Sequence, residues 1–339
     1  MLDLALVGFG PVGRAFAARL PAGARLVAVA DRSGVVADPG GLDAAALVEA
    51  KTRDGSLGAD AGALPPVDIT IDALPTDLRT GEPSLGLALR ALAQGSHVVT
   101  ASKGALALHA PLVSEAAARA GRVVRGSATV GAGTPVLELL SSAFGGDTLE
   151  GFDAVLNGST TFVLSRLEEG ASWDDALREA RGRGYLEADP SLDLLGLDAA
   201  AKAVILANHA WGPRLRLADV DAQGIAGVTR EEAMDARRNG FALRLVARAT
   251  PDGRVAVGPA ALPRDHALVA EGAQFAARLK FADAGVITLR GPGAGPRETA
   301  AALRSDVLAL PISAPVAKTR SGEAISKSFA ASPLRIGGR

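Results

Sequence analysis

The sequence predicts an α/β protein in which a doubly wound parallel sheet is followed by an α+β unit with a mixed sheet. Two observations predict the first part: apolar strands alternate with helical segments up to about residue 125, and a glycine-rich turn joins the first strand to the first helix. A third observation predicts the second part, because beyond residue 130 the alternation stops and a long hairpin pattern follows. The 339 residues are enough for two hydrophobic cores.

The composition excludes several classes of protein. Lys and Arg total 36 against 37 for Asp and Glu, so no general positive field attracts nucleic acid or an anionic membrane. The absence of cysteine excludes disulfides and a thiol nucleophile. No charge-free stretch approaches the ~18 residues of a membrane-spanning helix, and the apolar run after Met1 has no basic leader. We therefore expect a cytoplasmic protein without nucleic-acid or membrane partners.

The first element is a strand, a glycine turn and a helix. In LALVGFGPVG (4–13) an apolar strand runs into three glycines, and the following helix has Phe16 and Leu20 four residues apart. Glycines at this spacing allow a tight turn and let backbone N–H groups approach a pyrophosphate, as in a Rossmann-type fold. The candidate dinucleotide contacts are Gly8, Phe9, Gly10, Pro11, Val12 and Gly13.

The second strand, 26–30, ends at Asp31, close to the ~20-residue offset from the glycine turn at which an acid binds the adenosine ribose. The next residue, Arg32, is a candidate for binding a 2′-phosphate, with Lys51 as a second cation, and is equally compatible with an exposed loop. The sequence therefore predicts NAD or NADP as the cofactor and leaves the choice between them open.

The alternation of strands and helices continues beyond this point. We expect strands at 67–73, 97–100 and 122–125, and helices at 83–93 and 112–120. Ligands bind such sheets beyond the carboxyl ends of the strands, where ALPT (73–76) and TASKG (100–104) lie. Lys103 follows its strand directly, where a nicotinamide would meet its substrate, and the alternative is a solvated lysine. The candidate cofactor contacts in these loops are Leu74, Pro75, Thr76, Thr100, Ser102 and Lys103.

The middle of the chain has a different pattern. We expect helices at 135–144, 173–181 and 197–211, and a strand at 149–156. The strand ends in NGSTTF (157–162), whose amide and hydroxyl groups at the start of the next helix can receive a carboxylate. An N-cap is the commoner use of such residues.

Residues 186–202, LEADPSLDLLGLDAAAK, concentrate acidic side chains in a chain that is otherwise rich in Ala and Leu. Like charges repel, so a solvated surface does not explain this concentration well. Asp198 and Lys202 are four residues apart on the helix at 197–211 and therefore share a face. The alternatives are a binding site and a surface ion pair worth ~0.5 kcal/mol or less.

The last third begins with the hairpin FALRLVARATPDGRVAVGP (241–259). A strand at 286–289 then runs into GPGAG (291–295) and a helix at 299–310. A second glycine-rich junction between strand and helix indicates contact with the other end of the cofactor, through Gly293 and Gly295. Residues 311–339 have no periodicity, and we expect a tail or an arm.

These segments together resemble homoserine dehydrogenase, up to residue 310. The segment ARGRGYLEADPSLDLLGLDAAAK (180–202) fits that family's signature at many fixed positions, and five further motifs occur in the family's order: GFGPVG, VVTASKGALA, ATVGAGTP, VLNGSTTFVLSRL and GPGAGPRETAAALRSD. The resemblance implies interconversion of L-homoserine and L-aspartate 4-semialdehyde with NAD or NADP, in threonine, methionine and isoleucine biosynthesis. It also implies a homodimer that associates through the middle sheet.

Three parts of the chain are expected. Residues 1–130 form the dinucleotide-binding domain, which helix 296–310 closes. Residues 131–295 form the dimerisation and substrate-binding catalytic domain, and residues 311–339 form the tail. No regulatory domain is expected after residue 310.

The resemblance also implies roles for individual residues. Glu187 and Asp198 would bind the amino group of the substrate, and Asp193 would lie near its hydroxyl. Lys103 and Lys202 are the catalytic candidates, because hydride leaves carbon only as the hydroxyl loses its proton, and a group must accept that proton. The candidate substrate contacts are Asn157, Gly158, Ser159, Thr160, Tyr185, Glu187, Asp193 and Asp198.

The chain departs from the family at three positions, one of which is Leu186, where the family's signature has a small residue. The family's Asn before the lysine of its NK motif is Ser102 here. The family's Glu that helps backbone carbonyls to hold a monovalent cation, Na or K, is Ser127 here, so a cation site at Ser127, Val130 and Ala132 would lack its carboxylate.

Two alternative functions remain open at this point. One is another amino-acid dehydrogenase with the same nucleotide fold, and the other is a catalytically silent NAD(P)-binding homologue. Aspartate-semialdehyde dehydrogenase is excluded because it needs a cysteine nucleophile, which the chain lacks.

Overall fold

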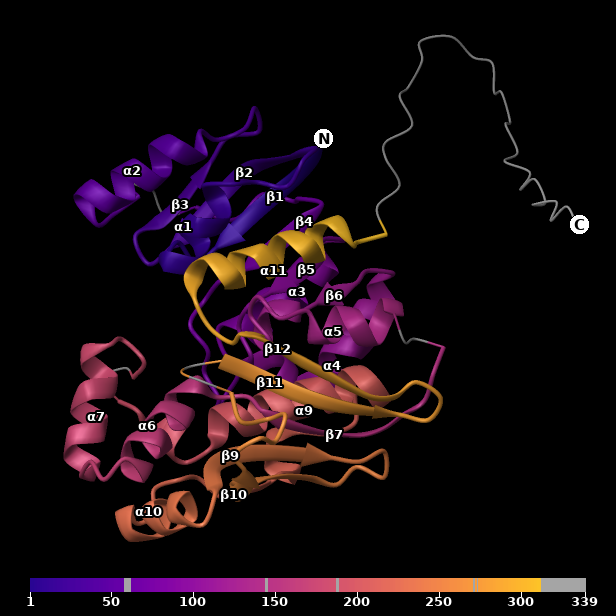
Figure 1. The fold of residues 1–339 in the computed structure, drawn as a ribbon. Helices are drawn as coiled ribbons and strands as arrows, with labels where there is room; N and C mark the ends of the chain where they lie inside the picture. The colour runs from indigo at the N-terminus through magenta and orange to yellow at the C-terminus, as the bar shows by residue number, and fades with distance from the viewer. Residues whose placement is uncertain (58–61, 144–145, 187–188, 271, 273, 312–339) are drawn as a thin grey trace, which may run out of the picture.

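The computed structural model describes residues 1–57, 62–143, 146–186, 189–270, 272 and 274–311 (Figure 1). Within these residues two six-stranded sheets each pack against helices. The first sheet is almost wholly parallel and the second is mixed, so the predicted fold class is confirmed. Residues 312–339, for which a tail was expected, lie outside the described part of the chain.

The first sheet has the strand order β3-β2-β1-β4-β5-β6. Its strands are β1 (Leu2–Val7), β2 (Ala24–Asp31), β3 (Gly34–Ala37), β4 (Ile69–Asp72), β5 (His97–Thr100) and β6 (Val124–Arg125). All neighbours are parallel except β3, which runs antiparallel to β2 at the edge. The chain passes from β1 to β2 on one side and returns to β4 on the other, so the order reverses between β1 and β4. Ligands of such sheets bind at this point.

Helices cover the first sheet on both sides of that point. They are α1 (Pro11–Ala17), α2 (Ala44–Asp54), α3 (Ser84–Ala93), α4 (Gly104–Ala120) and α11 (Pro296–Leu308). Helix α4 starts eight residues before the predicted position, because Pro111 does not begin a new helix; the backbone is non-helical only at His109, two residues before this proline. Helix α11 returns to this sheet from the end of the described chain and lies beside α1 (Figure 1), and its Leu303 packs in the same core as Leu6.

The second sheet has the order β12-β11-β7-β9-β10-β8. Its strands are β7 (Leu149–Val155), β8 (Asp221–Ala222), β9 (Phe241–Ala249), β10 (Val255–Pro263), β11 (Gln274–Phe281) and β12 (Gly285–Pro292). Neighbours are antiparallel except β8 and β10. One face packs against helices in a single core that contains Phe152, Leu245 and Ala277.

The helices of this second unit connect it to the first sheet. They are η1 (Ser127–Thr129), α5 (Val136–Glu138), η2 (Leu139–Ala143), α6 (Gly158–Glu168), α7 (Trp173–Gly182), α8 (Ser191–Leu194), α9 (Leu197–Trp211), η3 (Leu217–Asp219) and α10 (Arg230–Arg238). The predicted helix at 135–144 is therefore a short α-helix that continues with π-type hydrogen bonds. Helix α9 packs against α4, which follows β5. This contact brings the TASKG loop close to the acidic segment.

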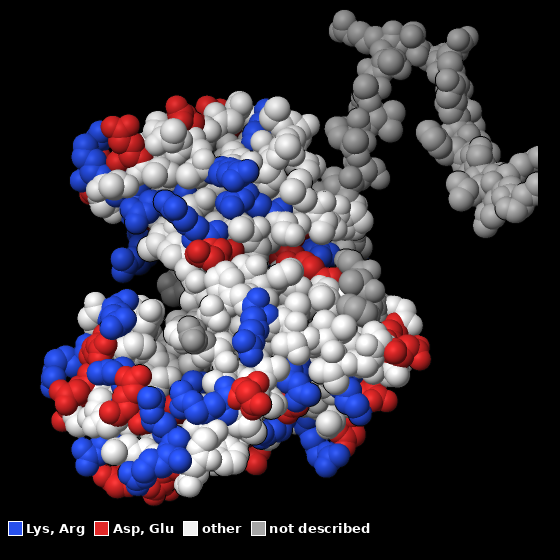
Figure 2. All heavy atoms as spheres, in the orientation of Figure 1, with Lys and Arg blue, Asp and Glu red and all other residues white. Residues whose placement is uncertain are grey.

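The surface has mixed charge. Figure 2 shows Lys and Arg interspersed with Asp and Glu over the lower part of the molecule, and the visible face is hollowed between the upper and lower parts. Among the described residues, no helix combines the length and the apolar character that a bilayer crossing requires.

Candidate active site

Asp198 joins the two candidate lysines. Lys103, the residue before α4, places its Nζ atom 3.5 Å from Oδ1 of Asp198. Lys202, one turn further along α9, places its Nζ atom 2.8 Å from Oδ2. The structure therefore brings both ammonium groups to opposite oxygens of one carboxylate.

The ammonium group of Lys202 is nearly buried and uses most of its donors within the protein. Only 9% of the residue is exposed, and its Nζ atom also donates to the backbone oxygen of Leu156 at 2.8 Å. An ammonium group has three N–H donors, so one donor is left for a ligand. The Leu156 carbonyl was not predicted, because a backbone acceptor leaves no mark on the sequence.

The two acids of the cluster have opposite pKa shifts. Burial by itself would raise the pKa of Asp198, but the ammonium groups of Lys202 and Lys103 hold this pKa well below its usual range. Burial raises the pKa of Asp193, and the neighbouring charge of Asp198 adds to that effect. Asp198 therefore stays ionised, whereas Asp193 binds a proton more readily.

Asn157 lies between these two acids. Its Nδ2 atom donates to Oδ1 of Asp193 at 2.5 Å and to Oδ2 of Asp198 at 2.9 Å. Its Oδ1 atom accepts from the backbone N–H of Thr160 and caps α6, which begins at Gly158. Four predicted substrate residues, in positions 157–158, 193 and 198, are thus adjacent in space.

Other predicted substrate residues lie beside this cluster. The hydroxyl of Ser159 donates to the backbone oxygen of Tyr185 at 2.6 Å. Thr160 is 0% exposed and its hydroxyl donates to the Asn157 carbonyl, so the structure does not offer that hydroxyl to a substrate. Glu187, predicted to bind the substrate, lies outside the described residues.

A cavity of about 500 Å³ connects two of the predicted segments. Tyr185 lines it on one side, and Gly293 and Gly295 line it on the other. A Cβ atom on Gly293 would lie 3.1 Å from Phe275 N, and Gly295 has a left-handed φ of +131°. Glycines at these positions allow the chain to turn from β12 into α11 along the cavity wall.

The first glycine turn has the geometry of a dinucleotide-binding loop. Gly8 has φ +98°, and a Cβ atom there would lie 2.4 Å from the Ala73 oxygen. A Cβ atom on Gly13 would lie 2.0 Å from the Gly8 oxygen, whereas one on Gly10 would meet nothing within 4 Å. The backbone at Gly10 is therefore open to a ligand, while the other two glycines allow close packing. These features fit a bound pyrophosphate.

The residues next to this turn have separate surroundings. The ring of Phe9 is 1% exposed and belongs to the core. Pro11 is the first residue of α1, and Val12 follows it at the helix start.

Asp31 is held at the end of β2 by three donors. Its Oδ2 atom lies 2.6 Å from Nζ of Lys51, and its Oδ1 atom accepts from the backbone N–H and hydroxyl of Ser33. Burial would raise the pKa of Asp31, but the hydrogen bonds from Lys51 and Ser33 lower it below the ordinary value. Lys51 thus pairs with the ribose-binding candidate, and the neighbouring Arg32 is exposed.

Asp72 links the two loops that follow β4 and β5. It is 2% exposed, and it accepts hydrogen bonds from Leu74 N at 3.0 Å and from Thr100 Oγ1 at 2.8 Å. The hydroxyl of Thr76 accepts from Lys103 N at 3.2 Å, which ties the loops together again. Sequence reasoning missed Asp72, although an acid at the end of an apolar strand is a usable signal.

Comparison with known proteins identifies the family. The sequence profile of homoserine dehydrogenase matches residues 135–308, which is more than half of the chain. The chain belongs to the homoserine dehydrogenase family. A second profile, of glutamate, leucine, phenylalanine and valine dehydrogenases, matches residues 2–79.

Individual homoserine dehydrogenases match almost the whole chain. The enzyme of Methanocaldococcus jannaschii is 32% identical, over 91% of this chain and 98% of the relative. The NAD(+)-dependent homoserine dehydrogenase of Pseudomonas canavaninivorans is 36% identical, over 90% of this chain and 95% of the relative. A hyperthermophilic archaeal homoserine dehydrogenase in complex with NADPH has a TM-score of 0.79 and 31% identity, over 91% and 96% of the two chains. The resemblance found from the motifs is confirmed.

The serine that replaces the homoserine dehydrogenase Asn lies in the loop after β5, which is a candidate for cofactor contact. Ser102 is 1% exposed, and its hydroxyl has no hydrogen-bond partner among the described residues. Its backbone N–H donates to Thr100 Oγ1 at 3.0 Å. The hydroxyl is therefore buried without a partner among the described residues.

The resemblance to homoserine dehydrogenase implied a cation site at Ser127, Val130 and Ala132. Val130 and Ala132 are buried, and Ala132 has a left-handed φ of +47°. Ser127 donates to Asp306 through its backbone N–H at 2.8 Å and its hydroxyl at 2.7 Å, so it is committed elsewhere. The residues thus supply no carboxylate at position 127, and a cation at these three positions stays a prediction. Within the described residues, no group of His, Cys, Asp and Glu suits a metal ion.

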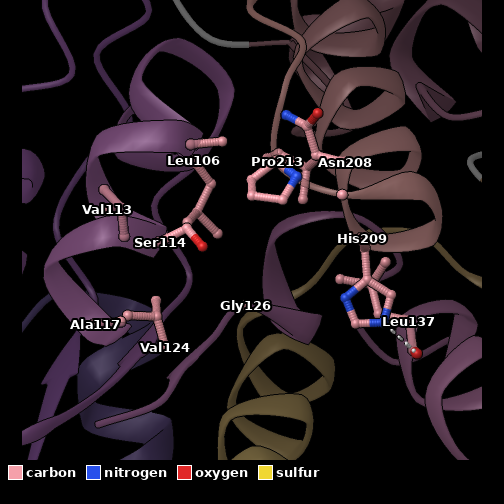
Figure 3. Close-up of a pocket in the computed structure, with 13 residues that line it drawn as sticks. Leu106, Val113, Ser114, Ala117, Val124, Gly126, Leu137, Asn208, His209 and Pro213 are labelled. Atoms are coloured by element: carbon pink, nitrogen blue, oxygen red, sulfur yellow. Dashed lines mark hydrogen bonds between the residues drawn. The ribbon is translucent and has the colours of Figure 1, made fainter. Parts of the chain in front are cut away.

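A second cavity, of about 360 Å³, lies between α4 and α9 (Figure 3). Leu106 and Val113 line it from α4, and Asn208 and His209 line it from α9. Nε2 of His209 lies 3.0 Å from the backbone oxygen of Leu137. None of the predicted site residues of this homoserine dehydrogenase family member lines the cavity.

Proposed function

We propose that this chain is an NAD(P)-dependent homoserine dehydrogenase, which interconverts L-aspartate 4-semialdehyde and L-homoserine for threonine, methionine and isoleucine biosynthesis. One geometric fact carries the assignment: Lys103 and Lys202, from distant parts of the chain, converge on Asp198. Family membership supports the same activity, since relatives over nearly the full length are named homoserine dehydrogenases.

The two lysines are proposed to move the substrate's hydroxyl proton. Bound NADH or NADPH supplies the hydride, which goes to C4 of the semialdehyde. An ammonium N–H of Lys103 or Lys202 then gives its proton to the carbonyl oxygen, and the reverse transfer accompanies oxidation. Lys202 has one uncommitted N–H donor for this purpose. Within the described residues, the ion pair of Lys103 is with Asp198, at 3.5 Å.

The acids of the cluster are proposed to hold the substrate. An ionised Asp198 attracts the substrate's ammonium group and orients both lysines. Asp193, which binds a proton more readily because of its burial, is proposed to face the hydroxyl. Tyr185 and the amide groups of Gly158 and Ser159 are proposed as further contacts, and Glu187 as a partner of the amino group.

The cofactor is proposed to lie across the point where the strand order of the first sheet reverses. The turn at positions 8–13 would hold the pyrophosphate and Asp31 the adenosine ribose, with Arg32 beside it. The loops at 74–76 and 100–103 and the glycines at 293 and 295 would contact the nicotinamide end. An open backbone at Gly10 and an unpartnered hydroxyl on Ser102 support this placement.

A second function, an amino-acid dehydrogenase that releases ammonia, is favoured by one observation. The profile of the glutamate, leucine, phenylalanine and valine dehydrogenases matches residues 2–79. That match covers only strands and helices of the first sheet, whereas Asp198 and Lys202 lie within the homoserine dehydrogenase match. We therefore prefer homoserine as the substrate.

The domain boundaries at 130 and 295, a homodimer and a cytoplasmic location complete the proposal. The face of the second sheet opposite its main core exposes Arg248, Lys280 and Val286 and offers a surface for a second copy. Free NAD(P) and a small amino acid are both cytoplasmic metabolites, which supports the location. Size-exclusion chromatography with light scattering tests the dimer, and the expected molar mass is twice the chain mass of 34.2 kDa.

A steady-state assay tests the function. NAD and NADP reduction are followed with L-homoserine, L-glutamate and L-leucine in parallel, with and without Na or K. We expect turnover with homoserine alone. Turnover with glutamate or leucine and none with homoserine would support the second function instead.

A further inference from the structure

The side chain of Asn157 is fully occupied by the protein. A primary amide has two N–H donors and one carbonyl acceptor. In Asn157 the donors serve Asp193 and Asp198, and the acceptor takes the backbone N–H of Thr160 at 2.9 Å. The residue is 3% exposed. Asn157 therefore has no donor to offer a substrate, although the sequence suggested it as a substrate contact.

We propose that Asn157 is a positioning residue, which holds Asp193 and Asp198 side by side and so fixes the carboxylate that the two lysines share. The expected effect of Asn157 on turnover rests on the proposed function. Its effect on Asp193 and Asp198 does not depend on any substrate. Two adjacent carboxylates repel each other, and a neutral donor that bonds to both offsets this repulsion without adding charge.

The backbone next to Asn157 extends the same arrangement. The Leu156 carbonyl accepts from Nζ of Lys202 at 2.8 Å, so residues 156 and 157 hold both the ammonium group and the carboxylate with which it pairs. The Asn157 carbonyl in turn accepts from the hydroxyls of Thr160 and Thr161. These hydrogen bonds fix the junction between β7 and α6, and the junction in turn fixes the positions of Lys202 and Asp198. A displacement of about 1 Å at such a site costs on the order of 10²-fold in rate.

A helix cap alone would not need asparagine here. Ser, Thr, Asp and Asn all cap helices, because each supplies the required oxygen. Only the amide also supplies two donors. The substitution Asn157→Asp keeps the size and the capping oxygen but places a third carboxylate against two others, and Asn157→Ser keeps a cap without adding charge.

The test compares these variants by turnover and by pH-dependent stability. For Asn157→Asp we expect kcat with homoserine to fall about 10²-fold, with KM for NAD(P) unchanged. We also expect its melting temperature to drop relative to wild type at pH 7 and to recover near pH 4, since protonation removes the repulsion. Asn157→Ser is expected to lose kcat without this extra pH dependence.

A double variant provides the rescue. Asn157→Asp with Asp193→Asn exchanges donor and acceptor, and we expect it to regain the melting temperature at pH 7 that Asn157→Asp loses. Wild-type kcat, or an unchanged pH dependence of melting, in Asn157→Asp would overturn the proposal. Lack of homoserine turnover in the wild-type protein would instead overturn the proposed function, because the melting experiment still reports on Asn157.

Discussion

Lys103 lies 3.5 Å from the carboxylate of Asp198, although one residue precedes α4 beside the first sheet and the other lies in the first turn of α9. Lys202 occupies the other oxygen of the same carboxylate. A single negative charge thus holds two like charges close together, which would otherwise repel each other.

Asp198→Asn is expected to separate the lysines and to lower kcat by ~10²-fold or more. The neutral amide keeps the size of the side chain but no longer attracts either ammonium group. Steady-state kinetics with homoserine measures the loss, and Asp252→Asn, in an exposed hairpin turn, is the matched control. Equal kcat in the two variants would contradict a central role for Asp198.

The two lysine variants are expected to differ in stability more than in rate. Lys103→Ala and Lys202→Ala are each expected to lower turnover by ~10²-fold or more. Only Lys202→Ala is expected to lower the melting temperature clearly, because it removes a buried donor from Asp198 and also leaves the Leu156 carbonyl without the Lys202 donor. Differential scanning fluorimetry beside the kinetics separates the two effects. Near-normal turnover in both variants would refute the assignment of proton transfer.

Asp193 is expected to reduce the stability of the protein at neutral pH. Burial raises its pKa, so its contribution is fully present below the unfolded pKa of about 3.9 and is lost as the pH rises through the folded value. Asp193→Asn should therefore raise the free energy of unfolding at pH 7 and change it little near pH 3. Urea unfolding at the two pH values measures the difference. If Asp193→Asn is less stable than wild type at pH 7, the hydrogen bonds to the Asp193 carboxylate stabilise the protein by more than the burial of its charge costs.

Sequence patterns predicted the elements with strong periodicity or clear caps. Helix α9 has the predicted bounds, Leu197–Trp211, and α7 begins at Trp173, the predicted first residue. Strand β3 was missed because it is only four residues long and partly exposed, so its sequence shows no alternation of apolar and polar residues.

The arrangement of the site was less accessible from sequence. The pairing of Asp198 with Lys202 follows from helical spacing, but the approach of Lys103 depends on how α4 packs against α9. Asp72 stands at the end of an apolar strand, which is a weak signal, but its partner Thr100 and the pairing of the Leu156 carbonyl with Lys202 are defined only by the folded chain. Local periodicity thus indicates elements, whereas contacts between distant segments required either the family resemblance or the structure.

A buried ion pair lies in the second unit. Arg244, with a side chain that is 6% exposed, lies 3.0 Å from Glu168, whose side chain is 2% exposed. Arg244→Met is expected to cost about 3–5 kcal/mol in the free energy of unfolding, because the carboxylate is left buried with weaker partners. Glu168→Gln combined with Arg244→Met should recover part of this loss, and chemical denaturation of both proteins provides the comparison. A loss below that of the exposed-pair variant Arg254→Met would contradict the prediction.

Asp31 is expected to control the choice between NAD and NADP. Its carboxylate pairs with Lys51 at 2.6 Å and, in the proposed pose, lies beside the 2′ position of the adenosine ribose, where it accepts from a hydroxyl and repels a phosphate. Asp31→Ser removes the repulsion and frees Lys51, with Arg32 nearby, for the phosphate. The ratio of kcat/KM with NADP to kcat/KM with NAD should therefore rise at least tenfold, about 1.4 kcal/mol in relative transition-state binding. Lys51→Met is the matched variant and should move the ratio in the opposite direction. If Asp31→Ser lowers kcat/KM with NAD and kcat/KM with NADP equally, Asp31 supports the loop through Ser33 and does not bind the ribose.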